Sequence, residues 1–251
     1  RRRRGPPPPP PGAATAAAGG RRRRWTLTPP PAPPPFLPQG LSALMQSLSM
    51  EGAAKAGVPA QVAAEVKTAG ASSLETSGLL EQLREEVSGT SKGRAENRLA
   101  ALAAVETLAG QLGEAGEPYG VALLPALLKC AADKDKKVGE AAAAAARAVA
   151  SAVCVHATKQ CVPVLLAGCD SVNKWQTIAL SLELITGFAQ EAPAQVAQCM
   201  SDIVPKLIGL LQDSKKQVKD NANLALRTAS TTAANADIEK LLPRLVSAME
   251  N

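Results

Sequence analysis

Four short segments of this chain repeat at a nearly constant spacing, and this periodicity limits its fold more than any other feature. In each segment a leucine or valine precedes a proline and further apolar residues follow; the prolines are Pro125, Pro163, Pro205 and Pro243. They are separated by 38, 42 and 38 residues. Self-similarity at a fixed period indicates a chain in which one supersecondary unit is used several times.

Within one period the apolar residues follow the spacing of two helices. The first helix has an apolar stripe at Ile203, Leu207, Leu210 and Leu211, and the second has a face of small residues at Val218, Ala222, Ala225 and Ala229. A turn around Asp213 separates them, and residues 214 and 217 have the spacing of a capping box. Because a helix pair of this kind cannot bury its stripe alone, we expect neighbouring pairs to stack on it.

We therefore predict an all-α fold, a HEAT- or armadillo-like α-solenoid of about four to five helix pairs, since those repeats have this period. The solenoid should span residues 74–251, and its first, proline-free pair should lie at 74–87 and 95–112. Residues 41–73 should form a helical cap or linker. The last unit should begin near Asp237 and have only its first helix. A proline inside each first helix predicts a kink there.

Residues 1–40 differ in composition from the rest of the chain. They hold 13 of the 20 prolines and eight arginines, and no acidic residue occurs before Glu51. Such a segment buries too little apolar surface to offset its ordering entropy, so we predict a disordered leader. It could be an arm that binds SH3-type domains or polyanions, a transit peptide, or the translated leader of a GC-rich transcript. We favour the last, because such transcripts encode runs of Arg, Pro, Ala and Gly.

The net charge of +6 comes from this leader. Without its eight arginines the chain has 20 basic and 22 acidic residues, a net charge of −2. Overall charge therefore gives no argument for nucleic-acid binding by the body. The chain begins with Arg1 rather than Met and stops at Asn251 within an apolar helical pattern, so we expect it to be a fragment.

The sequence offers little material for catalysis or for a cofactor. It has no G-x-x-x-x-G-K-[ST] loop, and its single histidine, His156, cannot complete a catalytic or metal site. Five cysteines without a C-x-x-C pair indicate small buried side chains in a reducing compartment. The most apolar run, 141–155, contains Arg147 and is shorter than a membrane span. We expect no enzyme activity, cofactor, metal, small-molecule substrate or membrane contact in this chain, and a cytoplasmic location.

Two groups of lysines are candidates for a binding surface. They are Lys134, Lys136 and Lys137 after one predicted turn, and Lys215, Lys216 and Lys219 after another turn two units later. Stacking would place both groups on one ridge, where they could contact phosphates or acidic protein. The alternative is a solvated helix start, although positive charge there opposes the helix dipole.

Trp175, which follows Lys174, is the third candidate. Counted from the aspartate of each turn, Trp175 stands where Val138 and Val218 stand in the neighbouring units. This equivalence predicts packing in the core. Stacking of Trp175 on an RNA base, with Lys174 beside it, is the alternative.

Several segments of the body resemble elongation factor 3 in the same order. The matching segments are 117–119, 123–125, 133–136, 173–176, 213–219 and 237–240. The similarity covers roughly residues 79–251, and its ordered spacing is more specific than HEAT periodicity alone. The alanine-rich second helices and the Pro/Arg leader depart from this family.

The resemblance implies a HEAT region that docks on the ribosome and contacts ribosomal RNA and proteins. In that family two ATP-binding cassettes, absent from this chain, drive release of deacylated tRNA from the exit site, so ATP is expected only there. A related HEAT region occurs in the ribosome-associated activator of the general amino-acid control kinase, which stays an alternative. A cytoskeletal or transport scaffold, with lysines that bind acidic protein tails or cargo, is another.

Overall fold

In the computed structural model of this protein, residues 39–48, 57–89, 95–231, 243 and 246–247 are described. All of them belong to one compact unit that extends from Phe36 to Asn251. The predicted disordered leader lies outside the described residues, except that the first helix already begins at Gln39. The helix predicted near Asp237 also lies outside them.

The described residues form helices and turns and include no strand. The helices are α1 (Gln39–Leu48), α2 (Val58–Ala69), α3 (Ser73–Thr76), α4 (Leu79–Ser88), α5 (Ala95–Leu112), η1 (Gly113–Gly116), α6 (Glu117–Cys130), α7 (Lys136–Ala152), η2 (Val155–Ala157), α8 (Thr158–Gly168), α9 (Trp175–Glu191), α10 (Pro193–Ala197), α11 (Met200–Leu210) and α12 (Lys216–Thr231).

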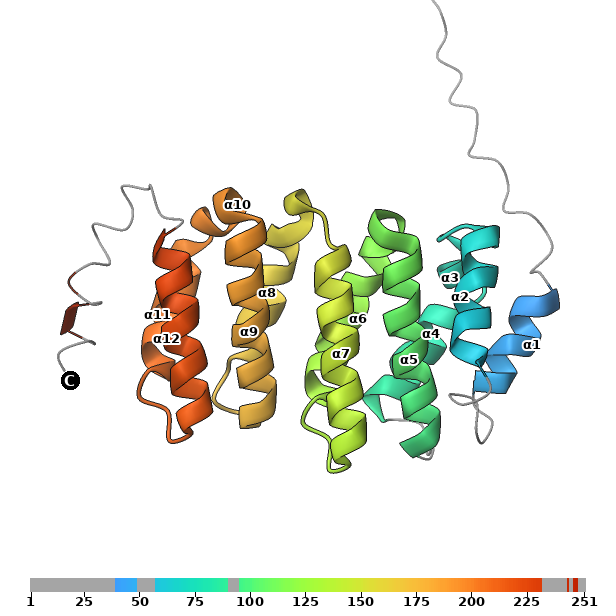
Figure 1. Cartoon of the computed structure of the whole chain (residues 1–251), viewed down its shortest axis with the longest axis horizontal. Coiled ribbons are helices and arrows are strands. Elements are labelled where there is room, and N and C mark those ends of the chain that lie inside the picture. Colours follow the sequence, from blue (N-terminus) through green and yellow to red (C-terminus); the bar gives the residue numbers. More distant parts are fainter. Residues whose placement is uncertain (1–38, 49–56, 90–94, 232–242, 244–245, 248–251) are drawn as a thin grey trace, which may run out of the picture. The chain divides into compact units, whose positions relative to one another are not determined.

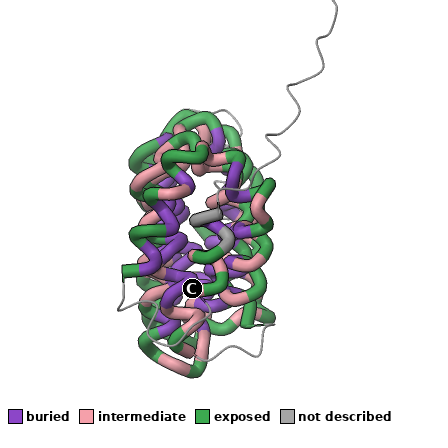
Figure 2. The backbone as a smooth tube through the Cα atoms, turned by 90° about the vertical axis from the view of Figure 1, so that its right-hand side faces the viewer, coloured by how far each residue is buried: buried purple, intermediate pink, exposed green. Residues whose placement is uncertain are grey.

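These helices stack side by side in two layers (Figure 1). In one layer α2 contacts α5 and α5 contacts α7, and α9 and α12 continue it; in the other, α4 contacts α6 and α6 contacts α8. The pairs α6–α7, α8–α9 and α11–α12 are the units predicted from the proline period, so the all-α solenoid is confirmed. Viewed along the stack, the buried residues face inward between the layers (Figure 2).

The first helix pair differs in detail from its prediction. Helix α5 coincides with the predicted span 95–112, but the span 74–87 is divided between α3 and α4. The break is at Gly78, whose φ of 76° lies in the left-handed region. Because that conformation interrupts a right-handed helix and suits only glycine well, an apolar period alone could not show the break.

Pro125, Pro163 and Pro205 each lie inside a first helix, as the period predicts. A proline in a helix interior removes one hydrogen bond and crowds the preceding turn, at a cost of about 3 kcal/mol in an isolated helix. Pro125 and Pro163 are exposed. Water can therefore reach the carbonyl groups that lose their partners, while the opposite sides of these helices remain in the core.

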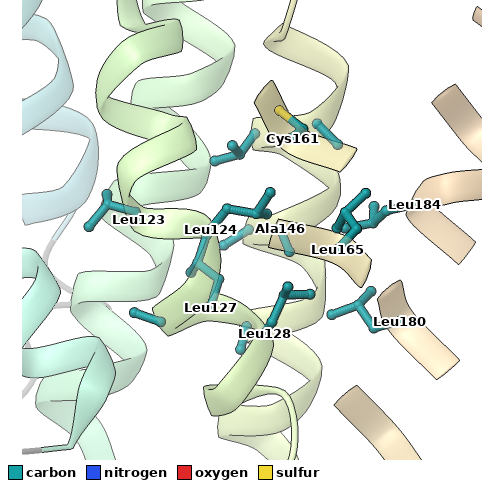
Figure 3. Close-up of a cluster of buried hydrophobic side chains, with 14 of the residues drawn as sticks. Leu123, Leu124, Leu127, Leu128, Ala146, Cys161, Leu165, Leu180 and Leu184 are labelled. Carbon is teal, nitrogen blue, oxygen red and sulfur yellow. The ribbon is translucent and has the colours of Figure 1, made fainter. Parts of the chain in front are cut away.

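The core combines leucines from the first helices with small residues from α7 and α12 and larger apolar residues from α9. Figure 3 shows one cluster, formed by Leu123, Leu124, Leu127 and Leu128 of α6, Ala146 of α7, Cys161 and Leu165 of α8, and Leu180 and Leu184 of α9. On α12, Val218, Ala222, Ala225 and Ala229 are fully buried, as predicted. Small side chains let neighbouring helices approach closely, so the alanine-rich second helices are a packing feature.

Polar contacts join successive units. The ion pairs are Arg98–Asp133, Arg147–Glu183 and Lys206–Asp170, and hydrogen bonds run from Thr177 to the Leu128 carbonyl and from Asn221 to the Ala179 carbonyl. Their partners are 35 to 49 residues apart, about one unit of the repeat. Each contact therefore links neighbouring helix pairs and helps to set their register.

Candidate functional site

The turns inside three successive helix pairs lie along one edge of the stack, the lower edge in Figure 1. We define this turn edge as residues 131–137, 169–176 and 211–219. Its exposed cations are the lysines singled out from the sequence: Lys134, Lys136, Lys137, Lys174, Lys215, Lys216 and Lys219. The structure thus brings the two predicted lysine groups to one edge, with Lys174 and Trp175 on the turn between them.

Two acidic residues of the turn edge pair with cations from outside it. Arg98 of α5 pairs with Asp133, and Lys206 of α11 pairs with Asp170. Burial alone would raise the pKa of Asp133, but hydrogen bonds from the Asp135 N–H and from Arg98, together with the Arg98 charge, lower that pKa below its usual value. Asp133 is therefore ionised at neutral pH, and its charge is neutralised by a residue of the preceding unit.

Two further aspartates accept backbone N–H groups where α7 and α12 begin. Asp135 Oδ1 accepts from the Lys137 N–H at 2.9 Å, and Asp213 Oδ1 accepts from the Lys215 N–H at 2.7 Å. The capping box predicted at 214–217 does not match this contact, because α12 begins at Lys216 and the acceptor is the side chain of Asp213. These two aspartates satisfy backbone groups of the fold, and their negative charges remain beside the lysines of the same turns.

The fold makes little use of the lysine charges. Lys136 Nζ lies 3.5 Å from Glu140 Oε1, but both side chains are largely exposed, so this pair contributes little. At the first turns of α7 and α12, positive charge is unfavourable with respect to the helix dipole. Lys174 differs, because its Nζ donates to the Ala132 carbonyl at 2.7 Å just after the end of α6.

Trp175 does not lie in the core, so its predicted equivalence with Val138 and Val218 is wrong. Those valines are the third residues of α7 and α12 and are fully buried, whereas Trp175 is the first residue of α9 and is 38% exposed. The third residue of α9 is the buried Thr177. The turn before α9 has six residues, not five, and its aspartate stands one place earlier, so counting from that aspartate shifted the register.

Trp175 corresponds instead to Lys136 and Lys216, the first residues of α7 and α12. The turn edge therefore carries Lys, Trp and Lys at equivalent positions of three successive units. Aromatic residues are rare in this chain, which has two Trp, one Tyr and two Phe. An exposed indole between two lysine positions is thus a distinct feature of this edge.

A groove opens beside Trp175 on the layer that contains α7, α9 and α12. Helices α5 and α7 pack closely, as do α9 and α12, but α7 and α9 make few contacts. The groove has a volume of about 550 Å³, and its lining at the turn edge includes Lys134, Lys136, Trp175 and Gln176. Gly139 and Ala143 form part of its wall on α7, and their small size leaves this space open.

The Arg147–Glu183 ion pair joins α7 to α9 within this groove. Arg147 Nε and one terminal nitrogen donate to the two Glu183 oxygens at 2.6 and 3.0 Å. A second hollow of about 340 Å³ shares these two residues and continues along α9 to Phe188 and Glu191. This groove was not predicted from the sequence; of the alanine run at 141–146 only Ala143 lines it, and Ala142, Ala145 and Ala146 lie in the core.

The cysteines are free and do not form a metal site. Among the described residues there is no group of three or more His, Cys, Asp or Glu side chains that could hold a metal ion. Cys130, Cys161 and Cys169 are buried, and burial raises the pKa of their thiols to about 11, 11 and 12. These three thiols are neutral at physiological pH and act as small apolar side chains.

No single helix in the described part of the chain is both long and apolar enough to span a bilayer. The segments Lys136–Ala152 and Val155–Gly168 pass such a test together, but they are bent by 112° relative to each other. Apolar residues of both segments, among them Val149 and Leu165, are buried in the core between the two layers, whereas Val155 is 44% exposed.

Stacked helix pairs with this period and a proline inside each first helix define a HEAT-repeat scaffold, a class that presents an extended surface. The family model for the EF3 N-terminal HEAT repeat matches residues 55–226. This match covers more than half of the chain, which therefore belongs to the family of elongation factor 3 N-terminal HEAT repeats. The resemblance noted in the sequence is confirmed.

Relatives include elongation factor 3 of Zygosaccharomyces rouxii, which is 38% identical over 160 residues, or 64% of this chain and 15% of that protein. Human stalled ribosome sensor GCN1 is 36% identical over 211 residues, or 83% of this chain and 8% of that protein. Protein ILITYHIA of Arabidopsis thaliana is 36% identical over 186 residues, or 72% of this chain and 7% of that protein. The chain thus spans only a small part of each relative.

Proposed function

We propose that this HEAT region is a ribosome-binding scaffold of a translation factor and that it docks through the turn edge. The observation that carries the proposal is the row of exposed lysines, of whose charges the fold makes little use apart from that of Lys174. The names of the relatives, elongation factor 3 and stalled ribosome sensor GCN1, make the ribosome the polyanion to test. Ribosomal RNA presents phosphates that lysines can contact with release of counterions, and such a factor would act in the cytosol.

A protein of the GCN1 type is the second candidate for the whole molecule. The alignment with human GCN1 covers 83% of this chain, whereas that with the yeast elongation factor covers 64%. In both candidates this region would serve as the ribosome-binding scaffold. ATP-driven release of tRNA is part of the elongation-factor candidate only, and it would require nucleotide-binding sequence in addition to this scaffold.

Charge reversal on the turn edge tests the docking proposal. We expect the triple variant Lys137→Glu, Lys215→Glu and Lys216→Glu to bind purified ribosomes about 10- to 100-fold more weakly in sedimentation assays. The slope of log affinity against log salt concentration should become shallower by about 2 to 3. Thermal melts should show no loss of folding, because acidic side chains are favourable at the start of a helix.

A matched variant controls for the change in net charge. Lys67→Glu, Lys159→Glu and Arg227→Glu replace three exposed cations outside the turn edge and should leave ribosome binding close to wild type. Equal weakening by both triple variants would show a general charge effect. Wild-type binding by the turn-edge variant would leave these lysines as a solvated face and end the docking proposal.

A further inference from the structure

Two apolar side chains of the turn edge are exposed, Val172 and Trp175, and Trp175 is the aromatic one. Its place at the start of α9 is held by Lys136 and Lys216 in the neighbouring units, so the repeat does not require an aromatic residue there. The indole remains 38% exposed although apolar surface normally favours burial. Its ring lines the groove between α7 and α9, where a planar partner could cover it.

An unpaired hydrogen-bond acceptor lies in the same groove. Gln176, the next residue along α9, lines it, and Gln176 Oε1 is buried without a hydrogen-bond partner in the protein. A buried polar atom without a partner is costly, and such atoms are rare in folded proteins. A ligand that brings an N–H donor into the groove would satisfy this oxygen.

The groove also has a source of positive charge. Lys134 and Lys136 line it from the turn between α6 and α7. Three acids, Asp133, Glu140 and Glu183, line it too. Asp133 pairs with Arg98 and Glu183 with Arg147, and the exposed Glu140 lies 3.5 Å from Lys136 Nζ, so that Lys134 is the lysine of the groove without an acidic partner among these contacts. The groove thus combines an aromatic face, an acceptor for an N–H group and two cations, which match the base, the base edge and the phosphates of a nucleotide.

We propose that this groove takes one unpaired base of a single-stranded RNA segment. The base stacks on Trp175, one of its N–H groups donates to Gln176 Oε1, and the flanking phosphates lie against Lys134 and Lys136. The inference rests on the proposed ribosome docking for the source of the RNA, and it narrows the target to an unpaired loop or bulge. Duplex RNA does not fit, because its bases are already stacked on one another.

Fluorescence of Trp175 gives a direct test in the full chain. With Trp25→Phe in the background, Trp175 is the only tryptophan. The ligands are an unstructured uridine oligomer of about 12 nucleotides, an RNA duplex, inorganic polyphosphate and polyglutamate. We expect saturable quenching of Trp175 emission by the uridine oligomer alone, because only that ligand offers free bases.

Variants at the same position separate stacking from charge. Trp175→Leu should bind the uridine oligomer about 5- to 150-fold more weakly, the loss expected for one base–aromatic stack, and should bind polyphosphate as wild type does. Trp175→Phe should keep most of the affinity. Trp175→Lys, which restores the residue of the neighbouring units, should bind polyphosphate more tightly but should lose the preference for single-stranded RNA. Thermal melts of each variant check that it is folded.

Equal quenching by the duplex or by polyphosphate would overturn the base pocket. Quenching by polyglutamate would also overturn it, and would indicate an acidic protein partner instead. An unchanged affinity of Trp175→Leu for the uridine oligomer would be equally decisive. Ribosome sedimentation of the turn-edge lysine variant tests the docking proposal separately. If that variant binds ribosomes more weakly while Trp175→Leu binds the uridine oligomer as wild type does, the docking proposal stands and the base pocket is refuted.

Discussion

Asp133 is an acidic residue of the turn edge whose ion pair with the preceding unit stabilises the stack. Its carboxylate pairs with Arg98 of the preceding unit and accepts the Asp135 N–H at 2.9 Å. These contacts lower its pKa in the folded protein, although burial acts in the opposite direction. The stabilisation is therefore complete above the usual aspartate pKa of about 4 and is lost as the pH falls through the lower folded-state pKa.

We expect Asp133→Asn to lower the melting temperature by about 2–4 °C at neutral pH, the shift that ~1 kcal/mol gives in a domain of this size. As the pH falls below the usual aspartate pKa of about 4, the difference should shrink, because the wild-type carboxyl becomes protonated in the folded protein too. Thermal melts across this pH range measure it. Glu140→Gln, at an exposed carboxylate, should have little effect at either pH. A difference that stayed constant with pH would show that charge is not its cause.

Among the elements, α8 and α9 approach each other closely because Gly168 has no side chain. A Cβ atom at this position would collide with Ser181 Oγ and would lie 3.2 Å from Leu128 Cδ1. Ser181 is fully buried, and its hydroxyl donates to the Thr177 carbonyl at 2.9 Å. The packing of this helix pair thus depends on small side chains, as it does on the alanine faces of α7 and α12.

Gly168→Ala should lower the free energy of unfolding by about 1–3 kcal/mol, because the added methyl group overpacks this contact. Gly209→Ala in α11 is the matched control, since no atom lies within 4 Å of the added Cβ. It should raise stability by up to ~1 kcal/mol through helix propensity. Urea unfolding measures both. Adding Ser181→Ala to Gly168→Ala removes the colliding hydroxyl and should restore part of the lost free energy of unfolding. If the double variant is no more stable than Gly168→Ala, the contact with Ser181 is not the cause of the destabilisation.

Regular apolar spacing was sufficient to predict the helices, but it did not predict the geometry of the turns between them. Helix α5 has the predicted bounds, and three prolines lie inside their helices as expected. The predicted helix at 74–87 is broken by the positive φ of Gly78, which its apolar residues do not show. The extra turn residue before α9 and the earlier place of its aspartate together moved Trp175 two positions away from the core position, and each position rotates the side chain by roughly 100° around the helix.

The candidate site was accessible from the sequence only in part. Repetition of lysines after equivalent turns placed them on one edge, since stacked repeats present equivalent positions together. The groove beside Trp175 depends instead on how closely α7 and α9 approach, and that spacing follows from packing over several units. No local pattern around Gly139 or Gln176 contains this information.

At the scale of the whole molecule, the junction between α7 and α9 is the least packed point of its layer. The Arg147–Glu183 pair that crosses it is about half exposed, so it contributes less than ~1 kcal/mol. On the other layer α6 contacts α8 directly, with Leu165 buried against α6 and α9 (Figure 3). The two parts of the stack are therefore held together mainly by the α6–α8 side.

We expect Leu165→Ala to cost about 2–5 kcal/mol and to increase hydrogen exchange in α8–α12 more than in α2–α5. The reason is that stability in a solenoid is carried by contacts between neighbouring units. Leu83→Ala in α4 removes a similarly buried side chain and should have the opposite distribution. A uniform rise in exchange along the stack after either substitution would instead indicate a single cooperative unit.

The sparse contact between α7 and α9 also has a mechanical consequence. Units joined in a row deform like springs in series, so a bending load produces most of its strain at the most compliant junction. Under such a load the packed α6–α8 contact would act as the pivot, and the side bridged by Arg147 and Glu183 would open or close around it. Curvature of the stack and width of the groove beside Trp175 would then change together, so that a force that straightens or bends this solenoid would change the shape of the turn edge.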